Sequence, residues 1–97
     1  MQIEKKQDGS KLALKVIGRL DTNTSPMLEA ELKLEGINEL EFDIAELEYV
    51  ASAGLRVFLG AQKAMIACGG KMTIAHPNAT VRNVFDITGC SGIFNIV

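Results

Sequence analysis

The chain has 97 residues, 47% hydrophobic and 23% charged, which is typical of one small globular domain over residues 1–97. Its formal net charge is −2 and its basic residues form no cluster, which argues against direct nucleic-acid binding. The N-terminus lacks an apolar signal region and no apolar run is long enough to span a membrane, so we expect a cytoplasmic protein without membrane insertion.

The sequence offers no ligand set for a metal ion. Its two cysteines, Cys68 and Cys90, lie in apolar surroundings and lack CxxC spacing, so we expect buried free thiols. His76 is the only histidine, and one histidine with two distant cysteines does not complete a metal site. No glycine-rich phosphate-binding motif is present either. We therefore expect no metal and no cofactor.

The first half of the chain predicts two strands, a helix and a third strand. Strands are indicated where apolar and polar side chains alternate, and the helix where apolar residues recur at helical spacing. Asp8-Gly9 is a hairpin signal between the first two strands, and Thr24 or Ser25 can cap the helix. The expected ranges are residues 1–6, 11–17, 23–34 and 39–44.

The second half predicts two helices, each followed by a strand. The first of these helices has apolar residues around most of its circumference. It begins directly after Ser52, and serine is favoured as an N-cap. Gly69-Gly70 ends it, and Gly89 ends the next helix. The expected ranges are residues 53–67, 71–75, 77–88 and 93–97.

This order of elements predicts an α/β fold. Strand–helix–strand units make the second, third and fourth strands parallel, with right-handed crossovers. Because these strands alternate instead of being apolar throughout, we expect helices on one face only, with Lys15 and Lys71 opposing Glu39 and Glu41 on the solvated face. The expected architecture is a two-layer sandwich with three helices and a mixed, mostly parallel sheet of four to five strands.

Three polar side chains are expected to meet at one edge of this sheet. Asp21 follows the second strand, Asp43 ends the third, and Ser52 precedes the second helix. In parallel units the carboxyl ends of strands lie beside the N-termini of the following helices, where α/β folds usually place their sites. Ser52 is interpreted first as a helix cap, yet the same position suits a phosphate, which would meet free amides and the positive helix end.

The sequence gives little support to an enzyme. Ser52 is not in a GxSxG elbow and no base is assigned to it, so a serine hydrolase is weakly supported. A response-regulator receiver would need an acidic pair after the first strand and a lysine after a late strand, and neither is in place. A domain that binds a small molecule or nucleotide at the Asp21, Asp43 and Ser52 edge stays open as an alternative.

Five segments resemble a family pattern, in order and at the right spacing. They are GRLDTNT at residues 18–24, FDIAEL at 42–47, YVASAGLRVFL at 49–59, GGKM at 69–72 and VRNVFDITG at 81–89. Together they resemble the STAS domain of bacterial anti-sigma factor antagonists, whose signature is [FY]-[IM]-[DS]-S-[STA]-G-L. The resemblance covers nearly the whole chain and implies the STAS fold.

The resemblance implies a partner switch. The unphosphorylated chain would bind an anti-sigma factor that is also a serine kinase, and a sigma factor would be released. Phosphorylation of the serine matching Ser52 would separate the complex, and a serine phosphatase would reset it. Antagonists of this type often carry Asp before the serine, where this chain has Ala51. The implied partner-binding residues are Asp21, Asp43, Ala51, Ala53, Gly54, Leu55 and Arg56.

The same resemblance allows a second function without a phosphorylation switch. Some short STAS domains are subunits of lipid-transporting ABC systems, and others belong to larger signalling assemblies. In that case the apolar second helix, with small residues at Gly60, Ala61 and Ala64, would form a constitutive interface.

Overall fold

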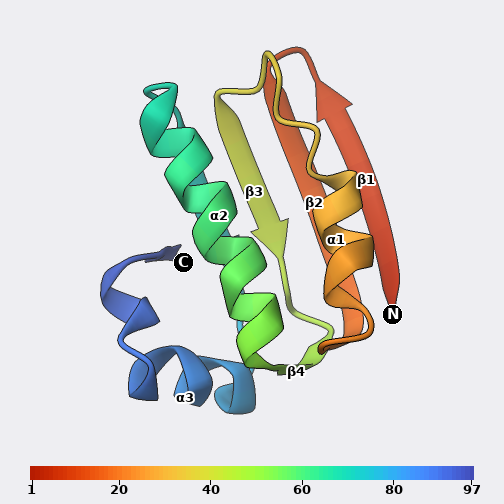
Figure 1. Ribbon diagram of the computed structural model, residues 1–97, viewed down its shortest axis with the longest axis vertical. Helices are drawn as coiled ribbons and strands as arrows, with labels where there is room; N and C mark the ends of the chain where they lie inside the picture. The colour runs from red at the N-terminus through yellow and green to blue at the C-terminus, as the bar shows by residue number, and fades with distance from the viewer.

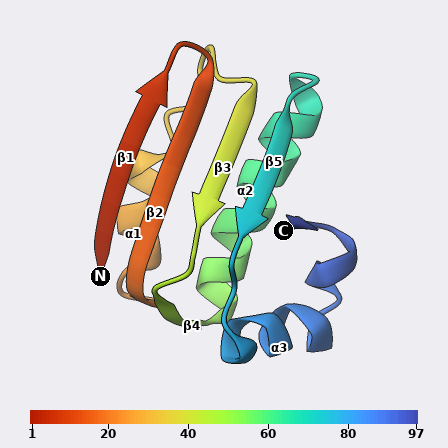
Figure 2. The ribbon, with the colours of Figure 1, turned by 180° about the vertical axis from the view of Figure 1, so that it is seen from behind.

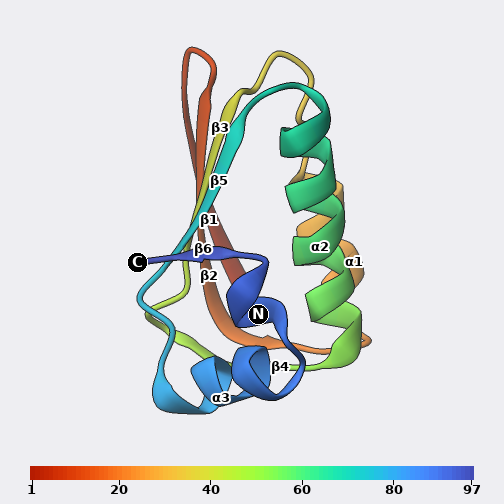
Figure 3. The same ribbon diagram turned by 90° about the vertical axis from the view of Figure 1, so that its left-hand side faces the viewer.

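The computed structural model describes residues 1–97 as a sheet with two helices on one of its faces and a third helix across one end (Figure 1). The side view separates the layers, with α1 and α2 on the same side of the strands (Figure 3). In chain order the elements are β1 Gln2–Asp8, β2 Lys11–Leu20, α1 Ser25–Glu31, β3 Glu39–Asp43, β4 Leu47–Val50, α2 Ser52–Ala67, β5 Lys71–Ala75, α3 Ala79–Ile87, the 3-10 turn η1 Cys90–Gly92, and β6 Asn95–Ile96.

The sheet has the order β1-β2-β3-β5-β6, and β4 pairs with β2 beyond the end of β3. β1 and β2 are antiparallel, whereas every other pair is parallel (Figure 2). The expected two-layer α/β architecture with a mixed, mostly parallel sheet and three helices is therefore confirmed. The sheet has six strands instead of four to five, because β4 was not expected.

β2 is longer than the sequence predicted because it changes partner at a glycine. Residues 11–15 pair with β3, and residues 18–20 pair with β4 after a register shift between Gly18 and Arg19. Gly18 has a φ of 101°, a conformation that costs a side-chain-bearing residue far more than glycine. This irregularity turns the end of β2 toward β4 and creates the corner at which α2 begins.

Two helices, α1 and α3, are shorter than the expected ranges of residues 23–34 and 77–88. α1 stops at Glu31 because Leu32 leaves helical geometry, with a ψ of 69°. Thr24 occupies the N-cap position of α1 without a capping side-chain bond, whereas Asn78 caps α3 by accepting a 2.8 Å hydrogen bond from the amide of Val81. The predicted strand over residues 93–97 is reduced to Asn95–Ile96, because the amides of Ile93 and Phe94 still donate to the carbonyl of Cys90, at 2.9 Å each, as a continuation of η1.

The core lies between the sheet and the helices. Four phenylalanines form its centre through edge-to-face contacts, with ring centroids 4.9 Å apart for Phe42 and Phe58 and 5.4 Å apart for Phe85 and Phe94. These rings connect β3, α2, α3 and the chain after η1. Cys90 is buried in the same core, but Cys68 is exposed at the end of α2, so the expectation of buried thiols was wrong for Cys68.

The other face of the sheet is open, as expected, and carries charges of both signs, but only one of the two lysines lies opposite an expected glutamate. Lys71 lies opposite Glu39, and Lys15 lies opposite Asp43. Lys15 also forms an ion pair of 2.6 Å with Glu46, and the hydrogen bond and charge of that carboxylate raise the pKa of Lys15 above its usual value. None of the helices combines the length and the hydrophobicity that a membrane-spanning helix needs.

Candidate functional site

Ser52 is the first residue of α2 and is exposed to solvent. The N-cap position belongs to Ala51, which is extended with φ −94° and ψ 175°, and no side chain caps the helix. The interpretation of Ser52 as the cap was therefore wrong by one residue. The reason is that Ala51 still follows the strand: its amide donates to the carbonyl of Leu20 at 2.8 Å, so the helix starts one position later.

The start of α2 is held against the end of β2 by close packing at Gly54. A Cβ on Gly54 would lie 2.7 Å from side-chain atoms of Leu20 and 2.9 Å from Val50, closer than real Cβ atoms come. Only glycine therefore allows this approach without a shift of the neighbouring side chains. Leu55, the next residue, is buried with 7% exposure. These contacts fix the position of the exposed Ser52 side chain.

Asp21 lies at the same corner, directly after Leu20. Its carboxylate accepts hydrogen bonds from the amides of Asn23 at 2.9 Å and Thr24 at 3.1 Å, and the Thr24 hydroxyl is 3.2 Å away. The Thr24 amide is the largest of the effects that hold the pKa of Asp21 below its usual value of 3.8, followed by Asn23 and the Thr24 hydroxyl. Asp21 is thus a charged residue in an ordered loop next to the start of α2.

Asp43 does not join this corner, so the expected meeting of three polar side chains was wrong in that respect. Asp43 is in register with Lys15 of β2. Lys15 lies six residues before Asp21, and six residues of a strand extend over about 20 Å. The Asp43 carboxylate also accepts from the amide of Ala45 at 3.1 Å and lines the open face with Lys15 and Glu41. The cause is the extension of β2 past the end of β3, where β4 takes over.

A groove of about 530 Å³ lies between α1 and α2 and was not predicted from the sequence. From α1 it is lined by Pro26 and Glu29, and from α2 by Ala53, Arg56 and Gly60, among others. Two residues of the expected partner-binding set, Ala53 and Arg56, therefore face this groove. The only signal in the sequence was the run of small residues on α2, which leaves space between the two helices.

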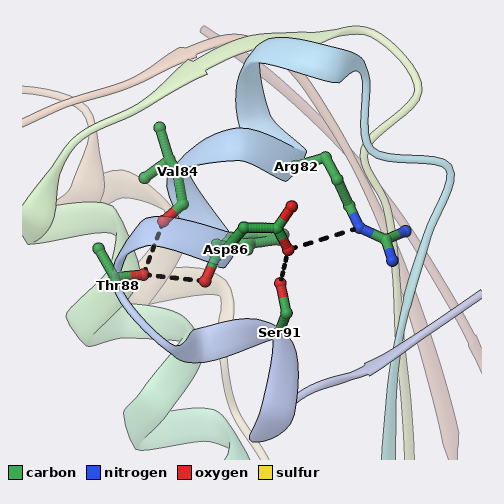
Figure 4. Close-up of polar contacts among 6 residues, drawn as sticks. Arg82, Val84, Asp86, Thr88 and Ser91 are labelled. Carbon is green, nitrogen blue, oxygen red and sulfur yellow. Dashed lines mark hydrogen bonds and ion pairs between the residues drawn. The ribbon is translucent and has the colours of Figure 1, made fainter.

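A second polar cluster closes the end of α3 (Figure 4). The Asp86 carboxylate accepts from the Ser91 hydroxyl and lies 3.9 Å from Nε of Arg82. The Thr88 hydroxyl donates to the carbonyl of Val84 at 2.7 Å, which satisfies the last turn of the helix. The bond between Asp86 and Ser91 holds η1 against α3, so we assign the cluster a structural role.

Comparison with known proteins identifies the family of this chain. The STAS domain model matches residues 2–97. The anti-sigma-B factor antagonist of Listeria monocytogenes is 30% identical over 95 residues, covering 95% of this chain and 83% of the relative.

Two solved structures share the fold. SpoIIAA in its unphosphorylated form has a TM-score of 0.86 at 18% identity, covering 99% of this chain and 88% of that one. The phosphorylated form of Bacillus SpoIIAA has a TM-score of 0.78 at 17% identity, covering 99% and 91%. Membership of a family of regulatory proteins agrees with the expectation that the chain is not an enzyme. The chain belongs to the STAS domain family and, within it, to the anti-sigma factor antagonists.

Proposed function

We propose that this chain, a single cytoplasmic STAS domain over residues 1–97, releases a sigma factor by binding its anti-sigma factor, and that phosphorylation of Ser52 ends the binding. The observation that carries the proposal is the position of Ser52: exposed, uncapped, and fixed at the corner between α2 and the Asp21 loop. Family membership supports the partner class, since the Listeria relative is named for antagonism of an anti-sigma-B factor.

The anti-sigma factor would itself be the serine kinase. Ser52 suits this role because its neighbours Ala51 and Ala53 are small and leave its side chain accessible. The kinase would have to accept Ala51 in place of the acidic residue that often precedes the serine. A serine phosphatase would remove the phosphate and return the chain to its binding form.

The phosphate would act on docking more than on folding. At the first turn of a helix, a phosphate is favoured by free amides and the positive helix end, so the fold tolerates it. A partner surface that covers this corner would meet about two added negative charges next to Asp21, which is already ionised. Repulsion and the desolvation of both groups would then weaken the complex.

The proposed docking surface surrounds Ser52. Ala51, Ala53 and Arg56 offer side-chain surface, whereas Gly54 and Leu55 are buried and contribute by holding the helix start in place. Asp21 supplies the charge at the edge. Asp43 lies on the open face of the sheet, so it would touch only a partner that extends there as well.

Affinity measurements on two variants test this proposal. Binding of the cognate anti-sigma factor is measured by calorimetry for the wild type, Ser52→Ala and Ser52→Asp. We expect Ser52→Ala to bind like the wild type and Ser52→Asp to bind at least about tenfold more weakly, equivalent to about 1.4 kcal/mol. Equal affinities for the two variants would show that charge at Ser52 does not control docking.

A constitutive subunit of a lipid-transporting ABC system, or of another signalling assembly, is the alternative function. The groove between α1 and α2, bordered by Gly60 and Ala61, favours it because it offers an interface that does not depend on Ser52. This alternative predicts co-purification with a membrane ATPase and no effect of Ser52→Asp on assembly.

A further inference from the structure

Arg56 lies four residues after Ser52 on α2, which extends over 16 residues. Residues at this spacing are neighbours on the helix surface, with Cβ atoms about 5 to 6 Å apart. Both side chains are exposed. The ion pairs of the chain are made by other residues, so the guanidinium of Arg56 is without a partner.

The other charged groups near this corner do not compete for that position. Arg19 stacks over the ring of Tyr49, with 4.7 Å from its guanidinium carbon to the ring centroid. Asp21 is negative and bonded within its own loop, and Glu29 faces the groove from α1 without pairing with Arg56. The first turn of α2 contains no acidic residue. Arg56 is therefore the cation placed to meet a negative charge on Ser52.

We propose that Arg56 binds the phosphate of phosphorylated Ser52 within the chain and in doing so leaves the wall of the groove between α1 and α2. The order is the favourable one, because an acidic group four residues before a basic one complements the helix dipole. A guanidinium can also donate two parallel hydrogen bonds to a phosphate. The inference rests on the proposed function only for the identity of the modified residue.

The consequence is that one modification changes two surfaces. The corner at Ser52 gains negative charge, which Arg56 partly neutralises, and the groove loses the positive charge that lined it beside Val57 and opposite Glu29. The affinity of a ligand or partner that binds in the groove would therefore change on phosphorylation, even if that molecule does not contact Ser52. Direct repulsion at Ser52 alone would leave the groove as it is.

The pairing is tested on the full chain with phosphoserine inserted at position 52 during translation, so that no kinase is needed. The phosphate is titrated by 31P NMR in the wild type, Arg56→Gln, Arg56→Lys and Lys63→Gln. Lys63 is the matched control, since it is exposed, makes no ion pair, and lies seven residues after Arg56 on the same helix. We expect the midpoint to rise by about 0.3 pH unit in Arg56→Gln, less in Arg56→Lys, and not in Lys63→Gln.

A second readout follows the groove itself. The Nε–Hε signal of Arg56 and the methyl signals of Val57 and Leu32 are compared with and without the phosphate. We expect all three to shift in the wild type, and the methyl shifts to shrink in Arg56→Gln. Equal titration midpoints for the wild type and Arg56→Gln, or an Arg56 signal that does not respond to the phosphate, would overturn the inference.

The result of this test can be distinguished from a failure of the proposed function. If the midpoints differ but no kinase modifies Ser52, the pairing stands and the partner switch fails. If the switch operates and the midpoints are equal, the pairing alone fails. Arg56 is exposed, so we expect each variant to melt like the wild type.

Discussion

The amide of Ala51 donates a 2.8 Å hydrogen bond to the carbonyl of Leu20, and this bond joins the end of β2 to the start of α2. The next residue on each side of the bond is functional in our proposal: Asp21 follows Leu20, and Ser52 follows Ala51. Two residues more than 30 positions apart in the sequence therefore share one corner.

Packing at Gly54 is expected to limit substitution at the helix start. Gly54→Ala would place a Cβ 2.7 Å from Leu20, and the resulting overpacking should cost about 1 to 3 kcal/mol in the free energy of unfolding. Gly60→Ala is the matched control on the same helix, because a Cβ there meets nothing within 4 Å. It should stabilise the chain by about 0.5 to 1 kcal/mol. Urea denaturation gives both values, and a loss of the same size in both variants would refute the packing argument.

Ser52 is expected to contribute little to stability, because it is not the helix cap. Ser52→Ala should change the free energy of unfolding by less than about 0.5 kcal/mol. Asn78 is the cap of α3, and its side-chain amide also donates a 2.9 Å hydrogen bond to the carbonyl of Leu47. Asn78→Ala should therefore lower the free energy of unfolding by about 1 to 2 kcal/mol. Thermal melts compare the two, and a Ser52→Ala loss as large as that of Asn78→Ala would restore Ser52 as a cap.

Asp21 is expected to make stability depend on pH. Its pKa is lower in the folded chain than its ordinary value of 3.8, so its contribution is complete above that value and disappears as pH falls through the folded pKa. Asp21→Asn should therefore be less stable than the wild type at pH 7, with the difference closing below about pH 4. Glu48→Gln, which removes another exposed carboxylate, is the control in urea melts across this range. A difference between wild type and Asp21→Asn that stays constant with pH would contradict this assignment.

Much of the fold could be predicted because alternation marks which strand residues are buried. Leu12, Leu14 and Val16 all face the core with at most 1% exposure, as their spacing indicated. β4 could not be predicted, since its buried residues Leu47 and Val50 are three apart and show no alternation. Its pairing with β2 depends on the register shift at Gly18, which is a tertiary feature.

The candidate site could be predicted only in part. Asp21 and Ser52 lie at one corner because each directly follows a residue of the bond between Leu20 and Ala51. Asp43 was expected beside them on the assumption that all parallel strands end at one level, and the extra length of β2 breaks that assumption. The groove that holds Arg56 was missed because it depends on where α1 ends and how α2 packs beside it.

Ser52 is, in our proposal, the residue through which the anti-sigma factor and this chain regulate each other. The most direct measurement is intact-mass analysis with fragment sequencing after incubation with ATP and the cognate anti-sigma factor kinase. We expect one added phosphate, located on Ser52, in the wild type and none in Ser52→Ala. A wild-type chain that gains no phosphate, or gains it at another residue, would contradict the proposed role of Ser52.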